Sequence, residues 1–168
     1  QIKNMNSGIY LDEELTIVHE SNFCIGAACY PEKHGDAPNI QTDMKYLKRK
    51  VEAGAEFLVT QMFFDNKDYF QFVERCRENG INVPIIPGLK PLASKKQLIA
   101  LPKIFNIDLP EALTNEVEKC KTDKEVVELG NQWAIEQCKA LIKADVPVLH
   151  FYTMGKSAQT QAICQAIF

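Results

Sequence analysis

The sequence lacks the features that mark several classes of protein. Its net charge of −3 leaves no excess of basic residues, which general nucleic-acid binding requires. No apolar run reaches the length that spans a membrane, and no signal peptide opens the chain. No Gly-x-Gly-x-x-Gly follows a strand-like segment, which argues against a Rossmann-type dinucleotide site. We therefore expect a cytoplasmic protein without nucleic-acid or membrane partners.

Cysteines are present but lack the spacing of a metal site. No Cys-x-x-Cys pair and no Cys/His cluster with zinc-finger spacing occurs, so we expect no bound metal. Most of the cysteines fall on apolar faces of expected elements, which is typical of buried free thiols in a reducing cytosol. The six are Cys24, Cys29, Cys76, Cys120, Cys138 and Cys164.

The length of 168 residues leaves room for one domain with a substantial core. Hydrophobic residues make up 46% and charged residues 24% of the chain, which is ordinary for a globular protein. Gln1 rather than Met opens the sequence, so we expect either a processed product or, in preference, a piece of a longer chain.

The stretch 57–65 organises the rest of the chain. It is a nearly continuous apolar run, which is typical of a parallel strand covered on both faces. Gln61 interrupts the run, and a buried amide without hydrogen-bond partners costs free energy. Its partner is either neighbouring backbone or, because Gln61 lies near the end of the strand, a ligand.

Strand and helix signals alternate four times, which predicts a parallel sheet with right-handed crossovers. After a lead-in segment over residues 1–22, we expect strands at 23–30, 57–64, 83–87 and 146–152. Helix signals lie at 39–53, between Asp65 and Gly80, and at 94–101, 109–120, 123–144 and 157–167. Four such units make half of a (β/α)8 barrel, and a small open α/β sheet is the alternative.

Five segments together resemble the methylenetetrahydrofolate reductase family. They are Ala28-Cys-Tyr-Pro-Glu-Lys-His34, Leu47-Lys-Arg-Lys-Val-Glu-Ala-Gly-Ala55, Thr60-Gln-Met-Phe-Phe-Asp65, Ile85-Ile-Pro-Gly88 and His150-Phe-Tyr-Thr153. The family fold is a TIM (β/α)8 barrel that holds FAD. The resemblance implies that residues 23–168 are its second half, strands five to eight, and that the glutamate proton donor belongs to the absent first half.

The resemblance also implies an activity. Members of the family reduce 5,10-methylenetetrahydrofolate to 5-methyltetrahydrofolate, with NADH or NADPH as the co-substrate and FAD as the carrier, in one-carbon metabolism and methionine biosynthesis. Gln61 matches the catalytic glutamine that contacts nicotinamide and folate in turn. An amide suits this role because it offers donors and an acceptor without charge.

Further site residues follow from the resemblance alone. Gln61, Gln97 and Lys156 match positions that bind the folate, although Lys156 replaces an arginine and cannot pair bidentately with a carboxylate. Tyr46 departs from the asparagine common in bacterial relatives. The positions that match FAD contacts are Tyr30, His34, Ala37, Asp43, Tyr46, Arg49 and Lys50.

Two other interpretations stay open. In the first, the chain is an inactive half-barrel or assembly module that lacks the catalytic acid. In the second, it is an unrelated phosphate-binding β/α enzyme. Four βα units also leave two open sheet edges and an uncovered apolar inner face, which invite pairing with another chain. We therefore expect a homo-oligomer.

Overall fold

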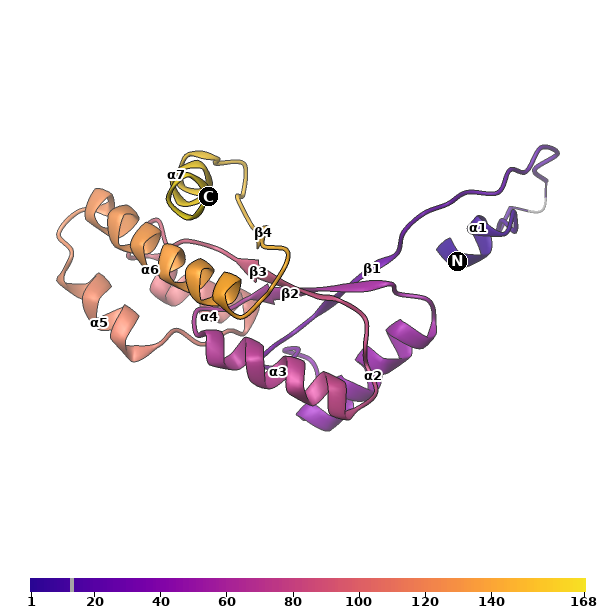
Figure 1. The fold of residues 1–168 in the computed structure, drawn as a ribbon, viewed down its shortest axis with the longest axis horizontal. Coiled ribbons are helices and arrows are strands. Elements are labelled where there is room, and N and C mark those ends of the chain that lie inside the picture. Colours follow the sequence, from indigo (N-terminus) through magenta and orange to yellow (C-terminus); the bar gives the residue numbers. More distant parts are fainter. Residues whose placement is uncertain (13) are drawn as a thin grey trace.

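The computed structural model describes residues 1–12 and 14–168, and it has a four-stranded parallel sheet with helices between the strands (Figure 1). The strands lie in the order β1-β2-β3-β4, so each pairs with its neighbour in sequence. This confirms the expected parallel α/β fold. The elements are α1 Ile2–Asn6, β1 Gly26–Cys29, α2 Ile40–Glu52, β2 Phe57–Met62, α3 Asn66–Glu78, β3 Ile85–Leu89, α4 Gln97–Phe105, α5 Glu111–Lys119, α6 Asp123–Lys143, β4 His150–Phe151 and α7 Ala158–Ile167.

Three strands are shorter than the sequence predicts, β2 by two residues and β1 and β4 by more. In β1 other groups take the backbone donors, and before β4 a proline lacks a donor. The amide of Phe23 donates to Asn6 Oδ1 and that of Ile25 to Glu56 Oε1, so β1 begins only at Gly26. Gly88 pairs with His150 in β4. Continuing this register backward places Pro147 opposite the start of β3, and proline has no N–H to donate. The predicted strands at 23–30 and 146–152 were therefore too long.

The outer face of the sheet carries the main core. Leu58 of β2 and Leu89 of β3 are fully buried, and they belong to one cluster with Phe72 of α3 and Cys138 of α6. A second cluster packs around Met62 and Leu101 beyond the carboxyl ends of the strands. Helices α2 to α7 thus stabilise one face of the sheet and the region above it.

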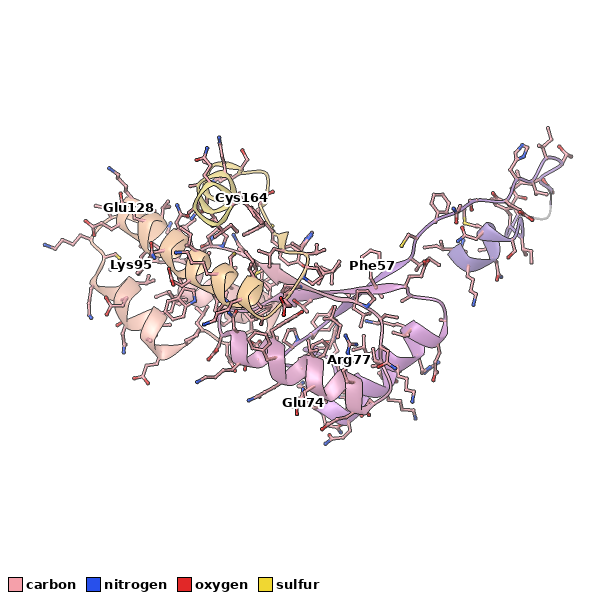
Figure 2. All side chains as sticks on the ribbon, viewed as in Figure 1. Phe57, Glu74, Arg77, Lys95, Glu128 and Cys164 are labelled. Atoms are coloured by element: carbon pink, nitrogen blue, oxygen red, sulfur yellow. The ribbon has the colours of Figure 1, made fainter. Side chains whose placement is uncertain are left out.

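The inner face of the sheet is less covered. Along β2 the buried positions alternate with half-buried Phe57, Val59 and Gln61, and His150 of β4 is exposed. Phe57 lies at the end of the sheet nearest the N-terminal segment (Figure 2), where its ring occupies the space that a side chain at Gly26 would need. The described residues therefore leave part of this apolar face open to solvent.

The N-terminal segment extends away from the body that the other elements form (Figure 1). Its short helix α1 is tied to the start of the sheet by Asn6, whose Nδ2 donates to the carbonyl of Phe23 at 2.9 Å. Several of its apolar side chains are exposed, including Leu11 and Ile17. The described part of residues 1–22 thus contributes little to the core.

The cysteines are free thiols, as the sequence predicts. Cys29, Cys76 and Cys138 are buried, whereas Cys24 is exposed. Burial raises the pKa of Cys76 to about 11 and that of Cys138 to about 12. None of the described helices is both long and apolar enough to cross a membrane.

Candidate active site

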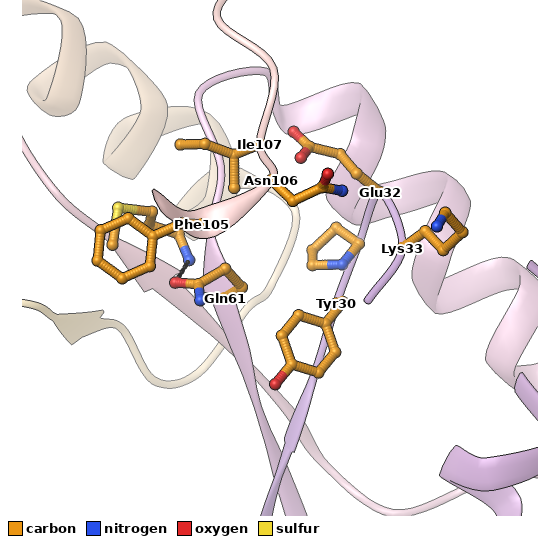
Figure 3. A pocket seen from close by; sticks show the side chains of 9 residues that line it. Tyr30, Glu32, Lys33, Gln61, Phe105, Asn106 and Ile107 are labelled. Atoms are coloured by element: carbon orange, nitrogen blue, oxygen red, sulfur yellow. Dashed lines mark hydrogen bonds between the residues drawn. The ribbon is translucent and has the colours of Figure 1, made fainter. Parts of the chain in front are cut away.

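The candidate site lies at the carboxyl ends of β1 and β2, where β/α proteins commonly place ligands. Tyr30, directly after β1, and Gln61, near the end of β2, line one pocket (Figure 3). The end of α4 and the residues directly after it supply the opposite wall, through Phe105, Asn106 and Ile107. Three parts of the chain that are distant in sequence therefore meet at this point.

Gln61 sits at an irregularity in the sheet. The register between β2 and β3 shifts between Val59 and Met62. There the amide of Gly88 donates to the hydroxyl of Thr60 at 2.8 Å, and Tyr152 donates its own hydroxyl to the carbonyl of Thr60 at 2.9 Å. Side chains thus replace ladder hydrogen bonds next to Gln61, as happens where bulges re-aim a side chain near active sites.

The amide of Gln61 is half satisfied. Its Oε1 accepts from the amide of Met62 at 2.9 Å, which is the backbone partner that one of the two interpretations predicts. No hydrogen bond from its Nε2 to another described residue is present. Two N–H donors therefore remain for a ligand, and they suit a carbonyl or ring-nitrogen acceptor.

His34 organises the loop after β1. Asp43 Oδ2 accepts from the backbone amide of His34 at 2.9 Å, which ties the loop to the first turn of α2. The Nδ1 atom of His34 accepts from the amide of Asp36 at 3.1 Å, and the imidazole meets the ring of Tyr30 edge-on at 4.5 Å. A neutral imidazole that accepts at Nδ1 carries its proton on Nε2. His34 therefore presents a donor at Nε2.

The basic residues of α2 lie beside this loop. Lys50 Nζ donates to the carbonyl of Ala28 at 2.8 Å and lies 5.8 Å from the centre of the Tyr30 ring. The guanidinium of Arg49 lies 5.6 Å from the ring of Tyr46, which is 53% exposed. Neither cation has a carboxylate partner among the described residues. They therefore remain available to an anionic ligand.

The structure brings only some of the predicted residues together. Tyr30, His34, Asp43 and Lys50 are linked by the contacts above, and Ala37 joins them through its amide, which donates to the carbonyl of His34 at 3.0 Å. Gln97 and Lys156 lie elsewhere, at the start of α4 and in the turn after β4. No hydrogen bond or ion pair among the described residues joins them to Gln61.

Gln97 and Lys156 have different surroundings. Gln97 Oε1 accepts from the amide of Ala93 at 2.7 Å, so its carbonyl is used in holding the loop after β3. Lys156 is exposed. Lys90, directly after β3, is half-buried. Burial is the main cause that lowers its pKa, and the charge of Lys156 lowers it further. The lysines form a basic region at the carboxyl ends of β3 and β4.

Glu32 is a residue that sequence reasoning missed. It lies within the Pro-Glu-Lys-His loop and lines the same pocket as Gln61. Its Oε2 accepts from the amide of Asp108 at 3.1 Å, whereas Oε1 is buried without a partner among the described residues. Burial is the main cause that raises its pKa to about 7. Its position in a quoted motif was a signal, but its contact with Asp108 spans 76 residues of sequence.

Comparison with known proteins decides the family. A family model described as methylenetetrahydrofolate reductase matches residues 12–167. The chain belongs to the methylenetetrahydrofolate reductase family. The 5,10-methylenetetrahydrofolate reductase of Escherichia coli is 35% identical over 161 residues, which is 95% of this chain and 54% of that protein. The probable methylenetetrahydrofolate reductase (NADPH) of Caenorhabditis elegans is 35% identical over 147 residues, 86% of this chain and 22% of that protein.

The chain therefore spans about half the length of the bacterial reductase that it matches, and less of the nematode one. A solved structure supports the fold. It is an uncharacterized protein from Clostridium thermocellum that is described as binding two copies of 5-methyl-5,6,7,8-tetrahydrofolic acid. It is 21% identical, has a TM-score of 0.53 and covers 84% of this chain and 51% of its own.

Proposed function

We propose that this chain is part of a flavin-dependent oxidoreductase that reduces 5,10-methylenetetrahydrofolate to 5-methyltetrahydrofolate, with NADH or NADPH as the co-substrate. The observation that carries the proposal is the linked set Tyr30, His34, Asp43 and Lys50 beside the free amide donors of Gln61, in a chain of this family. Each of these residues was expected at the site from the resemblance.

The residues present fit FAD as the cofactor. Arg49 and Lys50 lack carboxylate partners among the described residues, and a planar fork and a point charge suit a diphosphate. The rings of Tyr30 and His34 and the Nε2–H of His34 offer apolar and polar contacts beside them. When bound, the flavin supplies the hydride chemistry that no side chain can supply.

The remaining residues then orient substrate. Gln61 donates from Nε2 to an acceptor on the nicotinamide or on the pterin, and its uncharged amide serves both in turn. Lys156 and Gln97, at the carboxyl edge of the sheet, hold the glutamate end of the folate. Lys156 does so as a single point charge, which fixes a carboxylate less rigidly than an arginine would.

The arrangement of the strands supports placing residues 23–168 as strands five to eight of a TIM barrel. The four strands are parallel and consecutive, and the inner face is partly uncovered. In a barrel that face meets the strands of the other half. A chain of this kind without its other half is an inactive fragment or assembly module, and its open edges favour a homo-oligomer.

The experiment that tests the proposal removes the cations of Arg49 and Lys50 in the full-length parent enzyme. An Arg49→Ala/Lys50→Ala double variant should retain much less FAD after dialysis, because charge-assisted hydrogen bonds contribute roughly 1.5–3 kcal/mol each. The matched control is Lys45→Ala/Lys48→Ala, which removes two exposed lysines from the same helix. Flavin absorbance gives the occupancy. Equal occupancy in both double variants would show that Arg49 and Lys50 do not hold the cofactor.

A further inference from the structure

Glu32 connects two segments that border the candidate site. The loop after β1 carries it, and its Oε2 accepts the amide hydrogen of Asp108, which follows α4 and Ile107. This hydrogen bond ties the two segments across 76 residues of sequence. The second oxygen, Oε1, is buried and has no hydrogen-bond partner among residues 1–12 and 14–168. A buried acceptor without a donor is costly, and a charged one is more so.

The charges around Glu32 do not neutralise it. Lys33 is adjacent, but its ammonium donates to the backbone carbonyls of His34 and Ala37. The other charged groups that act on Glu32 are the carboxylates of Asp108, after α4, and Asp68, on α3, and both raise its pKa. No group of three or more His, Cys, Asp or Glu side chains in the described chain is arranged to hold a metal ion.

Protonation of the Glu32 carboxyl suits these surroundings. A protonated carboxyl is neutral, keeps an acceptor for the Asp108 amide and offers one O–H donor. The pKa of Glu32 is raised to about 7, first by burial and then by the two carboxylates, against a lowering effect of the Asp108 amide. The carboxyl therefore changes charge within the physiological pH range.

The segment that Glu32 holds is a wall of the site. Ile107 is 4% exposed and packs in the same cluster as Met62, the residue after Gln61. Asn106 has a φ of 53°, a left-handed conformation that ends α4 and turns the chain toward Glu32. Figure 3 shows Glu32, Asn106 and Ile107 together on one side of the pocket, with Gln61 and Tyr30 below them. The hydrogen bond of Glu32 therefore acts on a wall of the pocket that Gln61 also lines.

We propose that Glu32 is a positioning residue whose protonated carboxyl holds residues 105–108 against the Gln61 side of the site and whose ionisation loosens that wall. Ionisation by itself strengthens the hydrogen bond from the Asp108 amide, but it also places charge on a carboxyl whose Oε1 is buried without a donor among the described residues, so the charged side chain requires water at this junction. The inference rests on the proposed function only in naming the pocket as the place where substrate binds. The tie and its dependence on pH are properties of this chain by itself.

The sign of the effect on stability follows from linkage. The folded chain keeps the proton on Glu32 up to about pH 7, whereas a carboxyl in the unfolded chain loses it near its ordinary value of 4.5. The folded state thus binds more protons between these values, and stability falls as the pH rises through this window. The stabilisation is fully present below pH 4.5 and is lost by the time the pH passes about 7.

The first test follows the carboxyl directly in the 168-residue chain. In a sample with ¹³C-labelled glutamate carboxyls, the Glu32 carbon should titrate near pH 7, and the amide signals of Asp108 and Ile107 should shift over the same range. This measurement needs no variant. A midpoint near pH 4.5 for the Glu32 carboxyl would overturn the proposal. So would amide signals of residues 105–108 that do not shift as Glu32 titrates.

The second test uses Glu32→Gln, which mimics the protonated side chain because it keeps an acceptor and adds a donor. Urea unfolding is measured at pH 5 and pH 8. Between pH 5 and pH 8, the unfolding equilibrium constant of the unchanged chain should rise about tenfold more than that of the variant. The full pKa shift would give a larger factor, but solvent screens a side chain that is partly exposed. Glu52→Gln, an exposed glutamate at the end of α2, is the matched control and should behave as the unchanged chain does.

The outcomes separate this proposal from the proposed function. Identical pH dependence in Glu32→Gln and the unchanged chain would refute the role of Glu32, whatever the activity of the parent enzyme. In the parent enzyme, Glu32→Gln should remove a loss of substrate affinity between pH 6 and pH 8 while leaving flavin occupancy unchanged. If Glu32→Gln changes the pH dependence of stability as predicted but has no effect on substrate affinity, the assigned substrate is wrong and the role of Glu32 stands.

Discussion

The hydroxyl of Thr60 offers a direct test of how the candidate site is built. It is buried, and it accepts the amide hydrogen of Gly88 at 2.8 Å where the β2–β3 ladder is irregular. Thr60→Val keeps the shape of the side chain but removes the acceptor. The two backbones approach closely here, because a Cβ built on Gly88 would overlap the Thr60 carbonyl. The backbone of β3 is therefore fixed against β2 at this position.

The expected cost follows from leaving one buried donor unsatisfied. Such a donor costs about 1–3 kcal/mol. In a domain of this size, each kcal/mol lowers the melting temperature by about 2–4 °C. Thr60→Val should therefore melt roughly 2–12 °C below the unchanged chain. Calorimetry or far-UV circular dichroism measures the shift.

A control at another threonine isolates the hydrogen bond. Thr42 on α2 makes no side-chain hydrogen bond with the described residues, so Thr42→Val should change stability by less than about 0.5 kcal/mol. The reasoning fails if Thr60→Val and Thr42→Val melt together. It also fails if Thr60→Val melts lower but leaves the signals of Gln61 unmoved, because the irregularity would then not position the glutamine.

Three further predictions concern chemistry and assembly. Gln61→Glu in the parent enzyme should slow both flavin reduction by NAD(P)H and flavin reoxidation by the folate in stopped-flow experiments. Rates that both stay within about twofold would exclude the shared role. The purified chain should be a dimer or larger by light scattering and should not reduce folate, and a compact active monomer would contradict this. Cys24 should react with a thiol reagent well before Cys29, Cys76 and Cys138, because burial raises the pKa of these three thiols.

Local sequence signals predicted the order of elements well. The helix after β2 lies between Asp65 and Gly80, as the sequence predicts, and Asp65 caps it by accepting from the amide of Lys67 at 2.9 Å. Gly54 and Gly80 stand at the ends of α2 and α3 with positive φ, as expected of residues that stop a helix. These features depend on neighbours within a few residues, which is why a single sequence carries them.

The extents of the strands depended on distant side chains and could not be predicted in the same way. The start of β1 is set by Asn6 and Glu56, which take donors that a longer strand would have used. Neither residue carries a local signal for this role. The two-residue β4 depends on the register with β3, which the sequence of β4 alone does not specify.

Local and long-range contacts also separate two parts of the candidate site, residues 30–50 and residues 105–108. The residues from Tyr30 to Lys50 lie close in sequence, so a motif predicted them as a group, and the structure does bring the loop and helix α2 together. The wall at 105–108 is joined to them by the hydrogen bond of Glu32 with the Asp108 amide, at a separation that no motif spans. Because a carboxyl that is buried without a full set of partners is costly, we infer that Glu32 serves at this junction to position the wall.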